Sequence, residues 1–525
     1  MGTPMRRPFR LAALLGLLAS PAFGQSLTIA AGGAITSLDP HFFNAAPNNA
    51  IAEHIFSRLV DRDEQARIRP QLAESWRLVS DTEWVFALRR DVTWHDGRPF
   101  TADDVLFTLE RAPNVPNSPG GFGATLRSVK EASAPDPYTL RIVTHWPNPV
   151  LLAELASVFV VSRHVGTGAA TEAYNAGRAA IGTGPYRVVS HRQGDRTELA
   201  RNEGYFGGAE PWARVSYRFV ATDPARTAAL LAGDVDMIDQ VAPNDLPRLQ
   251  RDPRIVVSRI QSLRLAHLGP DFSRTGSLPH VTDNEGRPLP TNPFLDVRVR
   301  RALNIAINRD ALAERAMDGL ATPTGQWLPA GAYSHDPQTL PPRYDPDGAR
   351  RLLAEAGFPN GFRMTLHTMN DRFPNDARLS QAVAGMWSRI GVQTAVEALP
   401  WASYSARAAR QEFSMSLGSW GSTTGEGLSF PKSVLATFDR QQRTGSANHR
   451  RFSSRELDAL LQRAESIMDD AEREQAIHAM VRWSAENVPM FPLVHLTNVW
   501  ALKRGLTHAP RMDERTLAMG VRPAR

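Results

Sequence analysis

The segment 369–378 carries the side chains that are best suited to hold an anion. It contains Arg372, Asn375 and Arg378, and it lies between a strand expected at 363–368 and a helix expected after it. The N-terminus of a helix offers free N–H groups, and arginine offers two parallel donors that match a carboxylate. We predict that Asn375, together with Arg372 or Arg378, binds a carboxylate group.

Side-chain patterns that support catalysis are missing from the sequence. It has no G-x-S-x-G or H-E-x-x-H motif, and none of its three lysines stands in a glycine-rich phosphate loop. The 14 histidines are scattered, and cysteine is absent, which excludes thiol catalysis and cysteine-ligated metal. We therefore predict that the chain is not an enzyme and needs neither a cofactor nor a metal.

Residues 1–24 have the pattern of a secretory signal peptide. Arg6, Arg7 and Arg10 precede a short apolar run, and Ala22 and Gly24 supply the small residues of a cleavage site. The apolar run is much shorter than the ~20 residues that span a bilayer. Because the sequence has no cysteine that could carry a lipid at the cleavage site, we predict a periplasmic protein that is not a lipoprotein.

The rest of the 525-residue chain is typical of a folded α/β protein of two or three domains. Apolar residues make up 42% and charged residues 22%. Basic and acidic residues are interleaved, so the net charge of +6 does not favour a nucleic-acid partner. Apolar periodicity predicts strands at 27–30 and 84–88, and helices at 102–111, 296–317, 345–357 and 457–468.

Five blocks of sequence resemble a family of transport proteins. The most characteristic block is 72–76 followed by 86–105, which contains the turn His95-Asp-Gly-Arg98 and the helix-capping sequence Thr101-Ala-Asp-Asp104. The other four are 182–186, 201–208, 295–310 and 344–357. In order and spacing these blocks are similar to the extracytoplasmic solute-binding proteins of family 5, the peptide, nickel and opine group that serves ABC importers.

The resemblance implies an α/β, two-lobed periplasmic-binding-protein fold, similar to class II, with an extra subdomain in the first lobe. Lobe I would comprise 25–262, with the subdomain at 50–180, and lobe II would comprise 263–491. The last segment, 492–525, would return to lobe I. Strands at 265–269 and 488–494 would form the hinge, around which such clefts close on a solute.

The resemblance also implies where the solute binds. In peptide-binding members, an aspartate that follows a tryptophan in lobe II holds the peptide amine. Trp420 matches that tryptophan, but no aspartate follows it, and Glu426 is the nearest acid. We therefore expect Trp420 to form an apolar wall, and Glu426 or hydroxyls such as that of Thr423 to make polar contacts. The ligand-binding loop of lobe I would contain His41, Phe42 and Asn44.

We predict a monomeric receptor that captures a peptide or peptide-like solute and delivers it to the permease and ATPase of an ABC importer. Within this class the solute could be a peptide, an opine-like conjugate or a metal chelate. Two other interpretations stay open: a periplasmic hydrolase on the same scaffold and a chaperone-like binder of peptides. Turnover of the solute would favour the hydrolase, and broad, weak binding of denatured chains would favour the chaperone.

Overall fold

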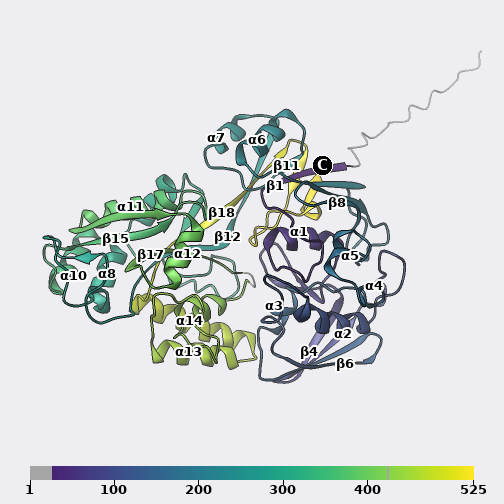
Figure 1. The fold of residues 1–525 in the computed structure, drawn as a ribbon, viewed down its shortest axis with the longest axis horizontal. Coiled ribbons are helices and arrows are strands. Elements are labelled where there is room, and N and C mark those ends of the chain that lie inside the picture. Colours follow the sequence, from purple (N-terminus) through teal and green to yellow (C-terminus); the bar gives the residue numbers. More distant parts are fainter. Residues whose placement is uncertain (1–25, 423–424, 525) are drawn as a thin grey trace, which may run out of the picture.

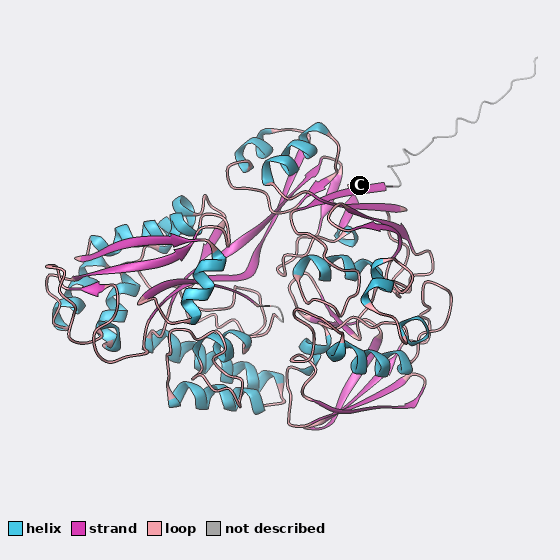
Figure 2. Cartoon of the chain, in the orientation of Figure 1, coloured by secondary structure: helices cyan, strands magenta, loops and turns pink. Residues whose placement is uncertain are grey.

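The computed structural model describes residues 26–422 and 425–524, so the predicted signal peptide and Thr423 lie outside the described residues. The chain folds into two lobes joined by long strands (Figure 1). Lobe I contains the elements from β1 (Ser26–Ala31) to α7 (Leu246–Arg251) and the segment near the C-terminus. Lobe II contains the elements from β13 (Val281–Thr282) to α14 (Asp470–Asn487). Helices and strands are mixed in both lobes (Figure 2), as the α/β prediction requires.

One 12-stranded sheet runs through both lobes in the order β13-β15-β17-β12-β18-β11-β1-β10-β9-β8, with β14 paired to β18 and β16 paired to β15. Strand β1 pairs in parallel with β10 and β11, and four of its six residues are buried, as is usual for parallel strands covered on both faces. The other strands of this sheet are β8 (Tyr186–Arg192), β9 (Arg196–Arg201), β10 (Arg214–Phe219), β11 (Met237–Ile238), β12 (Ile255–Pro270), β14 (Ala321–Pro323), β15 (Phe362–Met369), β16 (Val392–Leu399), β17 (Met415–Gly421) and β18 (Phe491–Lys503).

Strands β12 and β18 cross between the lobes side by side (Figure 1). Their antiparallel ladder is interrupted between Gln261 and Leu265. On the lobe I side of the break β18 pairs with β11, and on the lobe II side β12 pairs with β17. The predicted hinge strand 265–269 lies within β12, and 488–494 overlaps the start of β18. We keep the predicted lobe boundaries, 25–262, 263–491 and 492–525, as a proposal.

A separate four-stranded antiparallel sheet, in the order β4-β5-β7-β6, stands at the far end of lobe I. Apolar side chains from this sheet, from α2 and from the segment between β5 and α2 form their own core, which includes Phe86, Trp94 and Leu140. This unit falls within the predicted extra subdomain. Its strands are β4 (Ala73–Ser80), β5 (Glu83–Leu88), β6 (Val129–Asp136) and β7 (Thr139–Thr144), and two small hairpins elsewhere pair β2 (Val60–Arg62) with β3 (Ile68–Pro70) and β19 (Leu506–His508) with β20 (Val521–Pro523).

Helices begin where the sequence offers capping residues. The helix predicted at 102–111 is α2, and the backbone N–H of Thr101 donates to the Asp104 carboxylate at 3.0 Å. The α-helices are α1 (Ala46–Ile55), α2 (Ala102–Arg111), α3 (Leu151–Leu155), α4 (Arg163–Gly166), α5 (Thr171–Asn175), α6 (Asp223–Ala232), α8 (Val297–Ile305), α9 (Arg309–Ala311), α10 (Pro346–Glu355), α11 (Asp376–Ser388), α12 (Trp401–Ala409) and α13 (Arg455–Ser466), together with α7 and α14.

The single helix predicted at 296–317 is wrong, because the chain breaks it into three pieces. Helix α8 ends at Ile305, and the side chain of Asn308 accepts a hydrogen bond from Ala311 to begin α9, which continues as a π-helical turn at Leu312–Ala316. Asparagine favours such caps because its side chain competes with the backbone for hydrogen bonds.

Candidate functional site

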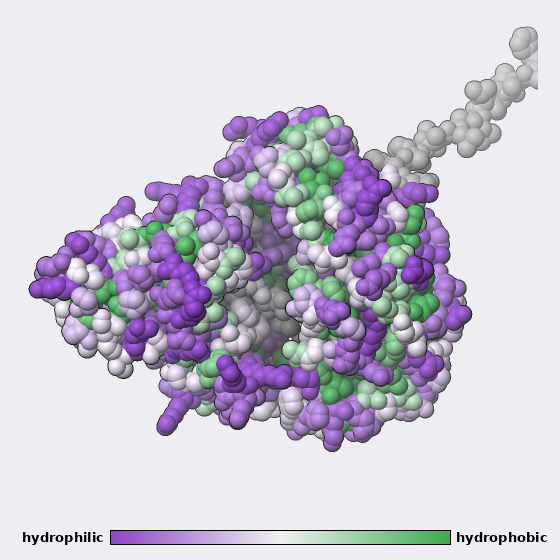
Figure 3. Space-filling view, in the orientation of Figure 1, coloured by the Kyte–Doolittle hydropathy of each residue, from purple (hydrophilic) through white to green (hydrophobic). Residues whose placement is uncertain are grey.

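A cavity of about 670 Å³ lies between the lobes, beside the crossing strands. A hollow is visible between the lobes in the space-filling view (Figure 3). Strand β18 supplies one wall, the loop after β11 supplies a second, and the loop between β15 and α11 of lobe II supplies a third. Residues from these walls include Gln240, Asn244, Asn370, Asp371, Arg372, Asn375, Thr497, Asn498 and Trp500.

A smaller cavity of about 120 Å³ adjoins the first. Asn44, Asn49 and Ser157 line it from lobe I, and Gly421 and Ser422 line it from lobe II. Arg264 and Glu514 line both cavities, so this pair of residues separates the two spaces. The two cavities together place hydrogen-bonding groups from both lobes around one ion pair.

Arg264 and Glu514 form a bidentate ion pair at this boundary. The Nε atom of Arg264 lies 2.9 Å from one carboxylate oxygen of Glu514, and its Nη2 atom lies 3.0 Å from the other. Arg264 stands where the β12–β18 ladder is interrupted, opposite Gly421 of β17. A side chain at Gly421 would come within 3.2 Å of the guanidinium of Arg264. The glycine therefore leaves the space in which the Arg264 side chain lies.

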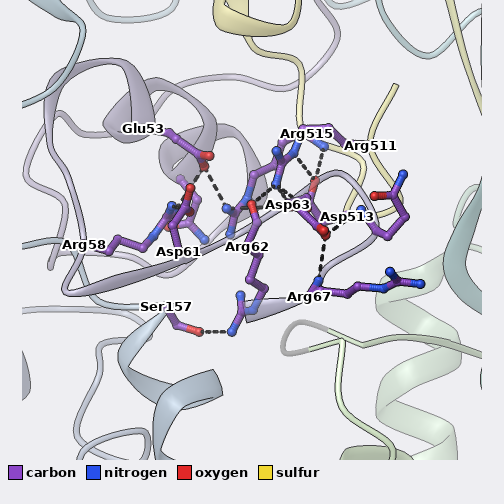
Figure 4. A network of polar contacts seen from close by, with 12 residues as sticks. Glu53, Arg58, Asp61, Arg62, Asp63, Arg67, Ser157, Arg511, Asp513 and Arg515 are labelled. Carbon is purple, nitrogen blue, oxygen red and sulfur yellow. Dashed lines mark hydrogen bonds and ion pairs between the residues drawn. The ribbon is translucent and has the colours of Figure 1, made fainter. Parts of the chain in front are cut away.

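The segment that carries Glu514 is anchored in lobe I by a network of buried charges (Figure 4). Glu53 of α1 pairs with Arg58 at 3.0 Å and with Arg515 at 2.8 Å, while Arg511 pairs with Asp513 at 2.8 Å. Burial alone would raise the pKa of Glu53, but these guanidinium groups hold it well below its usual range. Residues on both sides of Glu514 are thus tied to the body of lobe I.

Glu514 itself has a backbone φ of 67°, in the left-handed region that residues other than glycine seldom adopt. Such a conformation costs free energy and persists where the surroundings impose it. The neighbours on either side of Glu514, Asp513 and Arg515, are both held by ion pairs. The result is a carboxylate presented from lobe I to the crossing strand.

Two residues of the segment 369–378, for which we predicted anion binding, line the larger cavity: Arg372 and Asn375. The guanidinium of Arg372 lies 4.9 Å from the centre of the Trp401 ring, and within the described residues it has no ion-pair partner. Burial, together with repulsion from Arg264, lowers the pKa of Arg372, although the negative charges of Glu514 and Asp371 act in the opposite direction. The side-chain amide of Asn375 donates to Asp318 at 3.0 Å. Arg372 is thus the cationic group of this segment that is available to a solute.

Arg378 points elsewhere. Its guanidinium is held 2.9 Å from Asp318 and also by the backbone carbonyl of Arg315, and it lines neither cavity. Between the two arginines proposed for a carboxylate, the position therefore favours Arg372.

Trp420 and Glu426 do not line either cavity. Trp420 lies on β17, paired with Leu265, and its ring packs edge-on against Phe430. Glu426 is buried inside lobe II, where its carboxylate accepts a hydrogen bond from the backbone of Leu428 at 2.7 Å, and burial raises its pKa. Thr423 lies outside the described residues. The binding roles expected for these three residues stay predictions.

Of the three residues predicted in the ligand-binding loop of lobe I, one lines a cavity and two do not. His41 is fully buried, with its Nε2 atom 2.7 Å from the carbonyl oxygen of Phe159 and its Nδ1 atom 3.0 Å from Arg111. Burial lowers the pKa of His41 to about 4, so its imidazole is neutral near pH 7. Phe42 is half-buried and lines neither cavity, whereas Asn44 is exposed and lines the smaller cavity.

Sequence reasoning did not find Arg264 or Glu514. Arg264 directly precedes the predicted hinge strand 265–269, so a search for charged residues beside that strand could have found it. Glu514 has no such signal, because its partner lies 250 residues away in the chain.

Two further observations concern the described part of the chain, residues 26–422 and 425–524. No helix there is long and apolar enough to cross a membrane. In the same residues, no three histidine, aspartate or glutamate side chains are grouped as a metal site requires.

Comparison with known proteins gives the same family as the sequence blocks. The model of the bacterial extracellular solute-binding proteins, family 5 (middle), matches residues 67–442. Heme-binding protein A of Haemophilus influenzae is 28% identical over 479 residues, covering 85% of this chain and 82% of the relative. The glutathione-binding protein GsiB of Escherichia coli is 27% identical over 508 residues, covering 94% and 93%.

Solved structures of similar fold are also binding proteins. HbpA2 from Haemophilus parasuis superposes with a TM-score of 0.82 at 24% identity, covering 95% of this chain and 100% of that one. The periplasmic murein tripeptide-binding protein MppA, in its unliganded open form, gives a TM-score of 0.81 at 22% identity, covering 95% and 98%. These structures confirm the two-lobed fold. The chain belongs to family 5 of the bacterial extracellular solute-binding proteins, the solute receptors of ABC importers.

Proposed function

We propose that this protein is a periplasmic receptor that binds a peptide-like solute with a free carboxylate in the cavity between its lobes. It then presents the loaded, closed form to an ABC permease. The signal-peptide pattern of residues 1–24 supports the location, and the family supports the role in import. The observation that carries the proposal is Arg372, a guanidinium without an ionic partner among the described residues, at the wall of a cavity of about 670 Å³.

The size and lining of the cavity support a solute of a few residues. Its volume lies within the ~300–1,000 Å³ of typical small-molecule sites. Its walls offer amide side chains such as Gln240, Asn244 and Asn498, which can bond to peptide groups of any sequence. Relatives named for a dipeptide and for glutathione support the same class of solute.

Recognition of the solute through its carboxylate also agrees with the lack of an aspartate in the loop after Trp420. No aspartate follows Trp420, and the nearest acid, Glu426, is buried away from both cavities. A solute amine therefore has no free carboxylate in the described part of that loop, whereas a solute carboxylate has Arg372. The solute would be selected by its acidic end.

The proposal is tested by calorimetric titration of trialanine and of trialanine amide, which lacks the carboxylate. We expect trialanine to bind and the amide to bind much more weakly. Replacing Arg372 by glutamine removes a charged hydrogen-bond donor worth about 1.5–3 kcal/mol, so affinity for trialanine should fall by about tenfold to a hundredfold.

Arg378→Gln is the matched control, because Arg378 lies in the same segment but outside both cavities. It should bind trialanine as the unchanged protein does. Equal losses in the two variants, or equal binding of trialanine and its amide, would contradict a carboxylate site at Arg372. Cleavage of trialanine during the titration, seen by mass spectrometry, would favour a hydrolase.

A further inference from the structure

We infer that Glu514 sets the charge selectivity of the interlobe site, by neutralising Arg264 so that only one cationic group is left for the solute. This inference rests on the proposed function, since it concerns the same cavity. It predicts that the receptor takes solutes with one anionic group and discriminates against those with two.

The larger cavity is lined by two cationic side chains, Arg264 and Arg372. They are close enough for the charge of Arg264 to lower the pKa of Arg372. Two guanidinium groups facing one space would form a site for a doubly charged anion. The two-pronged contact of Glu514 with Arg264 occupies both donors that a second carboxylate would use.

None of the other acids that line this cavity forms an ion pair with Arg264 within the described residues. Asp376 accepts a hydrogen bond from the backbone of Arg372, and Asp371 accepts one from the backbone of Trp401. Asp223 and Asp239 both face Arg226. Glu514 is therefore the acid among the lining residues that offsets the charge of Arg264.

Glu514 is also held in place before any solute arrives. Its strained backbone and the buried ion pairs of its neighbours Asp513 and Arg515 present the carboxylate to the crossing strand. A carboxylate fixed in this way does not have to give up side-chain freedom when the cleft closes. A solute carboxylate that approached Arg264 would have to displace it.

The test compares N-acetyl-trialanine, which has one carboxylate, with N-succinyl-trialanine, which has two. The unchanged protein should bind the acetyl compound at least as tightly as the succinyl compound. In Glu514→Gln the second cation is released, and the preference should move toward the succinyl compound by about tenfold, the effect of one charge at short range in a partly hydrated site. The double variant Arg264→Gln/Glu514→Gln should return to the original preference.

Asp252→Asn is the matched control. Asp252 forms the same two-pronged contact with Arg254, at 3.0 and 2.7 Å, but neither residue lines a cavity. The preference of Asp252→Asn between the acetyl and succinyl compounds should be that of the unchanged protein. An unaltered preference in Glu514→Gln, or a shift that persists in the double variant, would overturn the inference.

Failure of the proposed function can be recognised separately. If neither acylated peptide binds the unchanged protein, the peptide-carboxylate proposal fails for these solutes. Citrate, a small trianion, then tests Glu514 alone through the melting temperature. If citrate raises the melting temperature of Glu514→Gln and does not raise that of the unchanged protein, the inference is supported. If citrate raises the melting temperature of neither protein, the inference is overturned.

Discussion

Replacing Glu53 by glutamine should destabilise lobe I, because Glu53 is the acid that joins α1 to the segment carrying Glu514. Its side chain is 6% exposed, and its partners Arg58 and Arg515 are 1% and 9% exposed. Glutamine keeps the shape but leaves two buried guanidinium groups with less negative charge. Breaking a buried pair from one side costs about 3–5 kcal/mol.

The lower end of that range applies here. Arg58 keeps Asp61 at 2.9 Å, and Arg515 keeps Asp513 at 3.8 Å, so neither cation is left without an acid. An unfolding entropy of about 2.1 cal/mol/K per residue amounts to about 1.1 kcal/mol/K for 525 residues. A loss of about 3 kcal/mol therefore lowers the midpoint of a single cooperative transition by about 3 °C, and by more if lobe I unfolds alone.

Differential scanning calorimetry at pH 7 measures the unfolding midpoint of Glu53→Gln and of a control variant, Glu203→Gln. Glu203 also pairs with an arginine, Arg201 at 2.9 Å, but its side chain is 67% exposed, and exposed pairs contribute little. The reasoning would be refuted if Glu53→Gln lowered the midpoint no more than Glu203→Gln did.

Two further substitutions test the electrostatics and packing of lobe I, and a third, in lobe II, is a control. Burial raises the pKa of Glu154 to about 7, so the folded state resists ionisation of this carboxyl and stability falls as pH rises from about 4.5 to 7. Glu154→Gln should therefore raise the free energy of unfolding in urea by about 3 kcal/mol at pH 8 and by less than about 1 kcal/mol at pH 5; equal gains at both values would contradict the pKa. A Cβ atom at Gly182 would lie 1.8 Å from the carbonyl oxygen of Ile55, so Gly182→Ala should cost at least about 3 kcal/mol. Gly385 lies at an exposed position of α11, and nothing lies within 4 Å of a Cβ atom there, so Gly385→Ala should gain about 0.5–1 kcal/mol. Similar costs in both alanine variants would show that the close approach at Gly182 is unimportant.

Local signals in the sequence predict much of the fold. The capping sequence at Thr101 begins α2, and the alternation at 84–88 lies within β5. The break after Ile305 was missed, because apolar spacing continues through it while the Asn308 cap interrupts the helix. Periodicity reports which face is buried, and it does not report where a side chain replaces the backbone as a hydrogen-bond partner.

The candidate site is less predictable, because its contacts join distant parts of the chain. The pattern of the segment 369–378 predicts an anion site, but the sequence does not show which arginine faces the cavity, because that depends on Asp318, which holds Arg378 away from it. The pairing of Arg264 with Glu514 crosses 250 residues and has no local pattern. Family resemblance indicates the lobes and leaves such chain-specific pairs unassigned.

Native mass spectrometry of the protein expressed from its full sequence, followed by release of any trapped molecule, tests the central claim most directly. The account predicts a peptide-sized solute that carries a free carboxylate, is released intact, and is retained by Arg378→Gln but lost from Arg372→Gln. A solute without a carboxylate, or one that Arg372→Gln retains as well as the unchanged protein does, would contradict the account.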